Sequence, residues 1–386
     1  MLENACRGGK RYWILLGVWV LLIVLGLAAY SQQLTKGLTI TGMSQDVVWG
    51  LYISQFTFLV GVAASAVMVV LPYYLHNYKA FGKMVILGEF LAVSAVLMCM
   101  LFIFVDMGQP ARVLNVILHP TLNSLMFWDF LALTGYLVLN LVIGGMTLDA
   151  ERKGAAAPKW VKPLIYLSIP WAVSIHTVTA FLYSGLEARP FWMTAILAPR
   201  FLASAFASGP ALLILLALIL RACTRFDPGK EAIQKLATIV TYAMVINLFF
   251  VLVELFTGLY GGMPHHVHPF QYLFTGLDGH AGLVPWIWVC EVLTVGCVVL
   301  LLMPNVRKQE KLLAMLCVAV IVAIWIEKGM AMIVTGFIPS PLGKITEYTP
   351  TQYEIAITVG VYAVGFFVLT VLYKIVLGVR ERLEVT

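Results

Sequence analysis

Ten runs of apolar residues, separated by short polar connections, dominate the sequence of 386 residues. A helix needs about 20 predominantly apolar residues to cross a bilayer. Backbone groups in lipid must bond internally, so each run is expected to be a helix. The predicted spans are residues 12–30, 51–75, 84–105, 125–146, 163–184, 201–221, 236–260, 283–303, 312–335 and 353–377. The sequence therefore predicts an all-α integral membrane protein with about ten transmembrane helices.

The scarcity of charge excludes other classes of protein. Charged residues make up 11% of the chain and hydrophobic residues 61%, whereas an ordinary soluble domain carries about 25% charged residues. Disorder is excluded as well, because it requires low hydrophobicity and high charge. The connections leave no room for a soluble domain of about 100 residues. A redox cofactor that needs such a domain is therefore expected on a partner subunit.

Lysine and arginine are divided unequally between the two sets of connections. Of the 25, 19 lie on the side of both termini, and one, Lys328, lies inside a span. The 5 on the opposite side are Lys36, Arg112, Arg189, Arg200 and Lys344. Because cytoplasmic loops carry the basic excess, we expect a bacterial inner-membrane protein with both termini in the cytoplasm. The net charge of +6 is then a topology signal, and no nucleic-acid partner is expected.

Ionisable residues form a predicted polar layer inside the spans, near the outer face. His176, Glu254, Glu291, Glu327 and Lys328 each lie roughly 9–14 Å from the outer end of a span, at 1.5 Å per residue. Such groups are costly in a bilayer and usually functional. Two interpretations are open: a polar cavity that exchanges protons with the outer side, or neighbouring charges that neutralise one another in a packed bundle.

Other polar side chains lie at the edges of this layer or below it. Asp106 and Asp129 mark the outer edge, and Tyr52 and Gln55 enter the second span at similar or shallower depth. The inner half offers Glu89 as its buried acid. We interpret Glu89 either as part of a transmembrane proton path or as a helix-packing carboxylate near the cytoplasmic water.

Cysteine and histidine positions give no ligand set for a metal or redox centre. The 6 cysteines include no CxxC pair, so neither an iron–sulfur cluster nor a disulfide framework is expected. A bis-histidine haem is not expected, because only His176 lies well inside a span. His265, His266 and His268 share a short predicted loop without a carboxylate beside them. Imidazole is a common metal ligand, but we prefer the interpretation that these side chains pack in the loop or at an interface to the interpretation that they bind a metal. Electrons are then expected to enter or leave through partners.

Three stretches resemble motifs of the NrfD/polysulfide-reductase membrane-subunit family. The first is Asp106-Met-Gly-Gln-Pro-Ala-Arg112 with Asn123-Ser-Leu-Met-Phe-Trp-Asp129. The second is Ser174-Ile-His-Thr-Val-Thr-Ala180 with Glu187-Ala-Arg-Pro190. The third is Glu327-Lys-Gly329 with Gly336-Phe-Ile-Pro-Ser-Pro-Leu-Gly343 and Glu347-Tyr-Thr-Pro350. The second and third resemble the ten-span branch, which includes the DsrP and HmcC subunits of complexes linked to dissimilatory sulfur and sulfate metabolism.

This resemblance implies two four-helix bundles, over residues 51–184 and 201–335, with flanking helices at 12–30 and 353–377. It implies a menaquinone pocket near the periplasmic face, inside the first bundle. It also implies a ferredoxin-like iron–sulfur subunit docked there and a multihaem cytochrome c nearby. A b-type cytochrome and a cytoplasmic iron–sulfur protein are the further partners expected in such a complex.

Some family positions are matched and others are not. Asp106, Arg112 and Asp129 match the family motif. Gln109 stands where the family often has Arg, and Leu125 where it often has Pro. The shorter members carry a histidine early in the first core span, and this chain has none there.

The resemblance and the polar layer together define candidate residues. The predicted quinone site comprises Asp106, Asp129 and His176 as reacting groups, with Tyr52, Gln55, Arg112 and Tyr136 as contacts; Gln55 substitutes for the missing histidine. The predicted proton pathway comprises Glu89, Glu254, Glu291, Glu327 and Lys328. The alternative interpretation of Arg112 is a charged side chain that extends to the membrane interface. The alternative interpretation of Tyr136 is ordinary packing within the bundle.

The predicted function is electron exchange between menaquinone or menaquinol and a periplasmic iron–sulfur or multihaem cytochrome partner. Proton translocation is a possible part of this function, and the resemblance implies a link to dissimilatory sulfur or sulfate metabolism. A secondary transporter is an alternative, because ten spans and a polar middle layer suit one. A passive membrane anchor for redox partners is a third interpretation.

Overall fold

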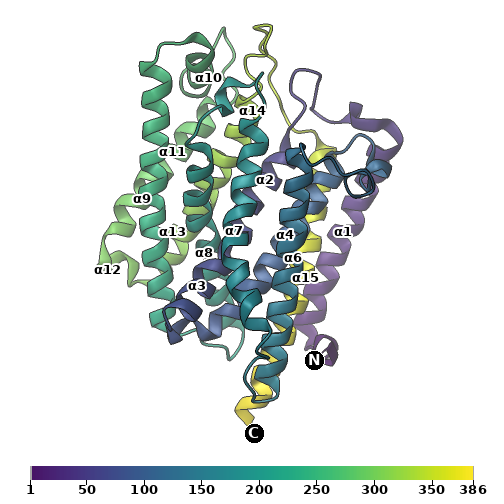
Figure 1. The fold of residues 1–386 in the computed structure, drawn as a ribbon, viewed down its shortest axis with the longest axis vertical. Coiled ribbons are helices and arrows are strands. Elements are labelled where there is room, and N and C mark those ends of the chain that lie inside the picture. Colours follow the sequence, from purple (N-terminus) through teal and green to yellow (C-terminus); the bar gives the residue numbers. More distant parts are fainter. Residues whose placement is uncertain (1, 386) are drawn as a thin grey trace.

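The structure, a computed structural model, describes residues 2–385. Within them, 10 helices are long and apolar enough to span a membrane, and Figure 1 shows them side by side. They are α1 (Lys10–Lys36), α2 (Leu51–Ala63) with α3 (Val67–Leu75), α4 (Gly82–Asp106), α6 (Leu125–Arg152), α7 (Val161–Ser184), α8 (Leu197–Cys223), α9 (Lys230–Tyr260), α11 (Val284–Leu302), α13 (Glu310–Ile324) with α14 (Met332–Thr335), and α15 (Gln352–Val385). The predicted all-α membrane fold is confirmed.

Short helices occupy the connections. They are η1 (Leu2–Cys6), η2 (Gly37–Ile40), η4 (Lys79–Phe81), η5 (Pro110–Arg112), α5 (Asn115–Leu118), η6 (Pro190–Trp192), α10 (Pro264–Phe274) and α12 (Pro304–Arg307). The 3₁₀ turn η3 (Ala64–Ala66) instead lies inside the second span, between α2 and α3. The predicted loop around His265 is therefore wrong, because these residues lie in α10. Pro264 at its first position is compatible with a helix start, since the first N–H groups lack helical partners anyway.

The long helices pack as two bundles and a flanking pair. Helices α2, α4, α6 and α7 are neighbours in the first bundle, and α8, α9, α11 and α13 in the second. Helix α2 packs against α8 and so joins the bundles, while α1 pairs with α15, which packs against α4. In Figure 1, α9 and α11 lie at one side of the molecule, and α1 lies at the other.

The junction between the bundles is closely packed. Every residue of α2 is buried, and the second span tightens into the 3₁₀ turn η3 where it meets α8. Gly209 of α8 faces this turn, and a Cβ atom there would lie 3.0 Å from the backbone nitrogen of Ser65. Small residues let membrane helices approach this closely.

The first span differs from the second in its burial. It has the highest hydropathy of the ten spans but is the least buried.

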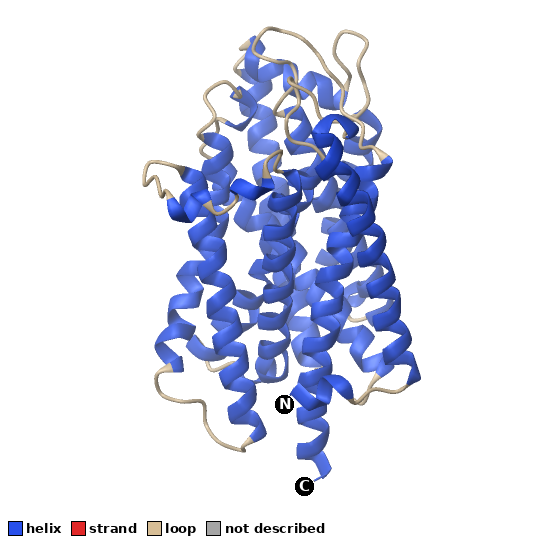
Figure 2. Cartoon of the chain, turned by 90° about the vertical axis from the view of Figure 1, so that its right-hand side faces the viewer, coloured by secondary structure: helices blue, strands red, loops and turns tan. Residues whose placement is uncertain are grey.

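Both ends of the chain lie at one end of the molecule, as Figures 1 and 2 show. We call the opposite end, which carries α10 and the connection between α14 and α15, the distal end. Some helices run past their predicted limits. Helix α9 begins at Lys230 and α15 continues to Val385. Hydropathy marks only the apolar stretch, whereas backbone hydrogen bonding continues into polar residues at the helix ends.

Candidate functional site

A cavity of about 680 Å³ lies between α2, α4, α15 and the ninth span. Its volume falls within the roughly 300–1,000 Å³ of small-molecule sites. Most of its wall is aliphatic or aromatic, including Phe58 and Phe366, and the polar side chains on it include Gln55. Residues 347–350 line its distal end. The cavity therefore offers an apolar volume with a small number of polar groups.

Gln55 presents a fixed hydrogen-bond donor to this cavity. Its Oε1 accepts a hydrogen bond of 2.8 Å from Trp325 Nε1 and one of 2.7 Å from the Tyr362 hydroxyl. An indole N–H can only donate, so the oxygen must face Trp325. The side chain is buried, and Nε2 makes no hydrogen bond with residues 2–385. The two N–H groups of Nε2 are therefore left for a group inside the cavity.

The distal end of the cavity is held by a buried carboxylate. Glu354 accepts hydrogen bonds from the Tyr348 hydroxyl, at 2.5 Å, and from the Gly42 amide, at 2.7 Å. The Leu51 amide donates to the same hydroxyl at 2.8 Å. Burial raises the pKa of Tyr348 above its ordinary value, so the phenol remains a donor. These bonds attach the connection before α15 to the first residue of α2.

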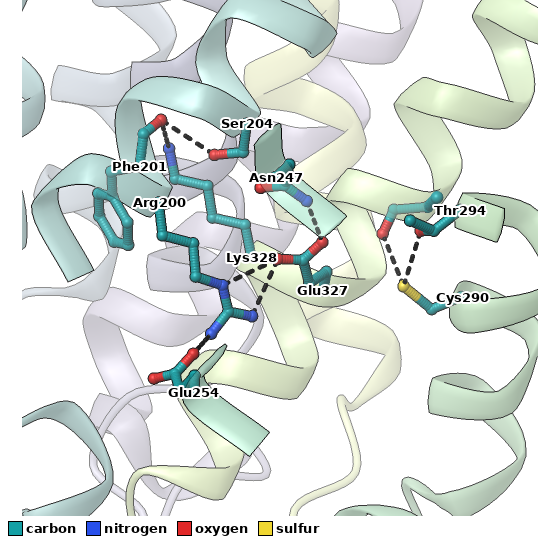
Figure 3. Close-up of polar contacts among 10 residues, drawn as sticks. Arg200, Phe201, Ser204, Asn247, Glu254, Cys290, Thr294, Glu327 and Lys328 are labelled. Atoms are coloured by element: carbon teal, nitrogen blue, oxygen red, sulfur yellow. Dashed lines mark hydrogen bonds and ion pairs between the residues drawn. The ribbon is translucent and has the colours of Figure 1, made fainter. Parts of the chain in front are cut away.

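A second polar site, drawn in Figure 3, lies in the second bundle. Arg200 of α8 binds two carboxylates. Its Nε donates to Glu327 Oε1 at 3.0 Å, and its Nη1 donates to Glu254 of α9. Asn247 Nδ2 donates to the other oxygen of Glu327 at 2.9 Å. The predicted acids Glu254 and Glu327 are thus brought together by an arginine.

The partner of Glu327 is not its neighbour in the sequence. The second interpretation of the polar layer has charges that neutralise neighbours in a packed bundle, and Glu327 binds Arg200, not the adjacent Lys328. The Lys328 Nζ lies 3.4 Å from the carbonyl oxygen of Phe201 and 4.2 Å from the centre of that ring. The sequence places Arg200 among the outer connections; it lies in the first turn of α8, because that helix begins at Leu197.

Glu291 completes the surroundings of Arg200. It lines a small cavity of about 20 Å³ together with Arg200, Glu254 and Glu327. A cavity needs roughly 10–15 Å³ of such volume to hold one water molecule. Three of the predicted pathway acids therefore converge on one space that has room for a single water.

Asp129 and His176 lie in the first bundle, away from the large cavity. Asp129 Oδ1 accepts a hydrogen bond of 2.6 Å from Thr179. His176 Nδ1 lies 2.8 Å from the Ala172 carbonyl oxygen. A carbonyl oxygen only accepts, so Nδ1 carries the proton and Nε2 is buried without a donor among the described residues. Neither residue lines the 680 Å³ cavity.

Tyr52 and Asp106 belong to a separate contact with α1. The Tyr52 hydroxyl donates to Gln33 Oε1 at 2.7 Å, and Gln33 Nε2 donates to the Val105 carbonyl oxygen at 2.6 Å. Next to Val105, one carboxylate oxygen of Asp106 is buried and has no partner within the described residues. This small network attaches the distal end of α1 to the first bundle.

The remaining predicted residues are dispersed. Tyr136 is buried in α6, and Arg112 is exposed in η5 at the distal end. Glu89 is buried in α4, and neither of its oxygens has a partner within residues 2–385. Of the seven residues predicted for a quinone site, Gln55 alone lines the large cavity. The roles of all seven stay predictions.

Sequence reasoning missed the groups that orient Gln55 and Glu327. Trp325 and Tyr362 lie inside apolar runs, where an aromatic residue is ordinary packing. One feature of the sequence could have pointed to Arg200. It is a basic residue one position before a predicted span, on the side that has few basic residues. Histidine, cysteine and acidic side chains form no group of three or more suited to a metal ion within the described residues.

Comparison with known proteins identifies relatives along most of the chain. A protein of Halobacterium salinarum named as a membrane subunit of dimethyl sulfoxide reductase is 27% identical, over 92% of this chain and 88% of the relative. The Hdr-like menaquinol oxidoreductase integral membrane subunit of Archaeoglobus fulgidus is 21% identical, over 95% and 93%. The menaquinone reductase integral membrane subunit of Nitratidesulfovibrio vulgaris is 22% identical, over 90% and 87%.

The resemblance drawn from the sequence motifs is confirmed at the level of the family. Residues 39–339 match the family described as polysulphide reductase, NrfD. This stretch runs from the end of the first span through the ninth span and the first residues of the connection that follows it. It includes Gln55 and the Arg200 site, whereas Tyr348, Glu354 and Tyr362 lie beyond it. The chain therefore belongs to the NrfD polysulphide reductase family.

Proposed function

We propose that this chain is the quinone-reactive membrane subunit of a respiratory oxidoreductase complex, and that its 680 Å³ cavity binds the headgroup of menaquinone or menaquinol. The observation that carries the proposal is the orientation of Gln55, whose Nε2 donor is left for a ligand inside an apolar cavity. The names of the Archaeoglobus fulgidus and Nitratidesulfovibrio vulgaris relatives support a quinone as that ligand.

The cavity suits the two parts of such a molecule. Gln55 Nε2 donates a hydrogen bond to a quinone carbonyl oxygen, and the aromatic side chains of Trp325 and Tyr362 lie beside it. The apolar wall formed by α2, α4 and α15 accommodates an isoprenoid chain and excludes water. A quinol supplies two electrons and two protons when it is oxidised, and the protein must provide the groups that receive those protons.

We further propose the partners and orientation expected from the sequence. Electrons pass between the quinone and a periplasmic iron–sulfur protein or multihaem cytochrome that docks at the distal end, next to residues 347–350 of the cavity wall. Both termini then lie in the cytoplasm, on the inner face of the bacterial inner membrane. The link to dissimilatory sulfur or sulfate metabolism rests on the motif resemblance.

Proton translocation is the final element of the proposal. The carboxylates around Arg200 and the space for one water beside them form its distal part. Glu89, buried in α4 without a partner among the described residues, forms its part nearer the cytoplasm. Buried ionisable groups in a membrane protein commonly mark proton relays, and this supports the assignment.

The test uses the whole complex purified with its partner subunits. Gln55→Leu removes the donor and puts an apolar side chain of roughly similar size in its place. We expect the KM for a soluble naphthoquinol to rise about tenfold, as for the loss of one good hydrogen bond. Gln33→Leu is the matched control, because Gln33 is also a buried, hydrogen-bonded glutamine but lies outside the cavity. An unchanged KM in Gln55→Leu would favour the passive anchor.

A further inference from the structure

One short helical segment joins the cavity to the Arg200 site. Residues Trp325–Ala331 form a π-helical turn, η7, between α13 and α14. Its first residue, Trp325, lies on the cavity wall and donates to Gln55. Two positions later, Glu327 binds Arg200 in the other direction, toward α8. The same turn therefore carries a side chain of each site.

A π turn needs contacts that hold it. It accommodates one residue more than the α-helical pattern, is rare, and is often found at functional sites. Reversion to an α-helix would rotate the residues before the turn relative to those after it. Within the described residues, Arg200 and Asn247 hold Glu327 on one side, and Gln55 holds Trp325 on the other. The two sets of bonds thus fix the same turn.

We propose that Arg200 is a positioning residue for the quinone headgroup site, and this inference rests on the proposed function. By binding Glu327, Arg200 fixes the π turn so that Trp325 Nε1 points at Gln55 Oε1. The Gln55 amide then keeps its oxygen on Trp325 and its nitrogen toward the cavity. Arg200 acts at a distance from the headgroup, through the intervening side chains.

The contacts of the Arg200 guanidinium explain why this residue can hold the π turn. Its Nε and Nη2 both contact Glu327 Oε1, at 3.0 and 2.9 Å, while Nη1 binds Glu254. A planar guanidinium can hold both carboxylates at once, whereas an ammonium acts as a point charge. Without the cation, two buried carboxylates would face each other unpaired, which strongly disfavours the observed arrangement.

The chain contains a matched control pair. Arg221, near the other end of α8, binds Glu310, the first residue of α13, through Nη1 and Nη2. Arg200 and Arg221 therefore both attach α8 to the ninth span, through bonds of the same kind. Of these two bonds, the Arg200 bond reaches the π turn. Loss of either bond weakens the contact between the helices, but only loss of the Arg200 bond is expected to affect the headgroup site.

The experiment is a double-mutant cycle on the purified complex, read out as the Kd of a soluble naphthoquinone analogue. Trp325→Phe removes one hydrogen bond and is expected to raise Kd about three- to tenfold. Arg200→Gln is expected to raise Kd by a similar factor. Because both act through the same bond, the double variant is expected to lose no more affinity than the weaker-binding single variant. Arg221→Gln is expected to leave Kd unchanged.

Multiplicative effects of the two substitutions on Kd would overturn the inference, as would an equal loss in Arg221→Gln. If Arg200→Gln does not assemble, Arg200→Lys keeps the cation without the guanidinium fork; it is expected to raise Kd, and a wild-type Kd would contradict the inference. Failure of the proposed function is distinguishable, because Gln55→Leu would then leave Kd unchanged as well.

Discussion

Trp325 Nε1 and Gln55 Oε1 lie 2.8 Å apart and join the ninth span to the second. The bond fixes the direction of the Gln55 amide, and with it the donor that this amide offers to the cavity. Through the turn η7, it also connects the cavity to the Arg200 site. Substitutions on either side of this bond test the parts of the molecule that it connects.

The second donor to Gln55 is the Tyr362 hydroxyl, and Tyr362→Phe removes it. We expect the affinity for a naphthoquinone analogue to fall about two- to tenfold, because one hydrogen bond that orients the amide is lost. Tyr373→Phe is the control: Tyr373 lies on the same helix, but its hydroxyl donates to the Leu87 carbonyl oxygen. Titration of the purified complex measures both, and equal losses would contradict the role assigned to Tyr362.

Glu327→Ala leaves Arg200 and Asn247 without the carboxylate that they share in a buried site. Removal of one member of a buried ion pair costs about 3–5 kcal/mol, so we expect a large decrease in the midpoint of thermal unfolding. Asp149→Ala breaks more exposed pairs with Arg152 and Lys153, which are worth about 0–1 kcal/mol. Similar midpoints for the two variants would mean that the Glu327 site is hydrated in solution.

Asp46 gives a pH-dependent contact at the distal end. Its hydrogen bond of 2.6 Å from Lys344 lowers the pKa of Asp46 below the ordinary 3.8. A lowered pKa in the folded protein stabilises the contact above the unfolded pKa, and this contribution is lost as the pH falls through the folded pKa. Asp46→Asn should therefore increase hydrogen exchange of residues 337–351 at pH 7.

At low pH, the difference in hydrogen exchange between wild type and Asp46→Asn is expected to disappear. Below the lowered pKa of Asp46 the wild-type carboxylate is protonated, so the exchange rates of wild type and Asp46→Asn are expected to converge. Asp278→Asn serves as the control, since Asp278 forms no ion pair within the described residues. A difference between wild type and Asp46→Asn that persists at acid pH would exclude the Lys344 contact as its cause.

Glu89→Gln tests the inner part of the proposed proton path. In vesicles that contain the whole complex, we expect the variant to lose proton uptake from the side of the termini while it still oxidises quinol. Glu231→Gln is the control, because Glu231 is exposed at that same end and bonds to Tyr78. Proton uptake that is unchanged in Glu89→Gln would leave Glu89 a packing residue.

Part of the candidate site could be predicted from the sequence. The resemblance predicts Gln55 as the substitute for a histidine of the shorter family members, and Gln55 lines the cavity. Glu254, Glu291 and Glu327 share a depth in their spans, and they meet around Arg200. Depth follows from position in the span, so residues of equal depth are candidates for contact. Depth shows neither which helices are neighbours nor how each helix is rotated. His176 has a similar depth, but it lies on α7 and lines neither cavity.

The sequence by itself determined the number of spans, the helical class and the family, because the bilayer requires about 20 apolar residues per helix and motifs are local. Tertiary structure decided which spans are central: α1 is the most hydrophobic but α2 is buried on all sides. In lipid both environments are apolar, so hydropathy does not separate them. It also decided that Arg200, Glu327, Trp325 and Gln55 form one chain of contacts, since these come from three helices whose relative rotation only packing sets.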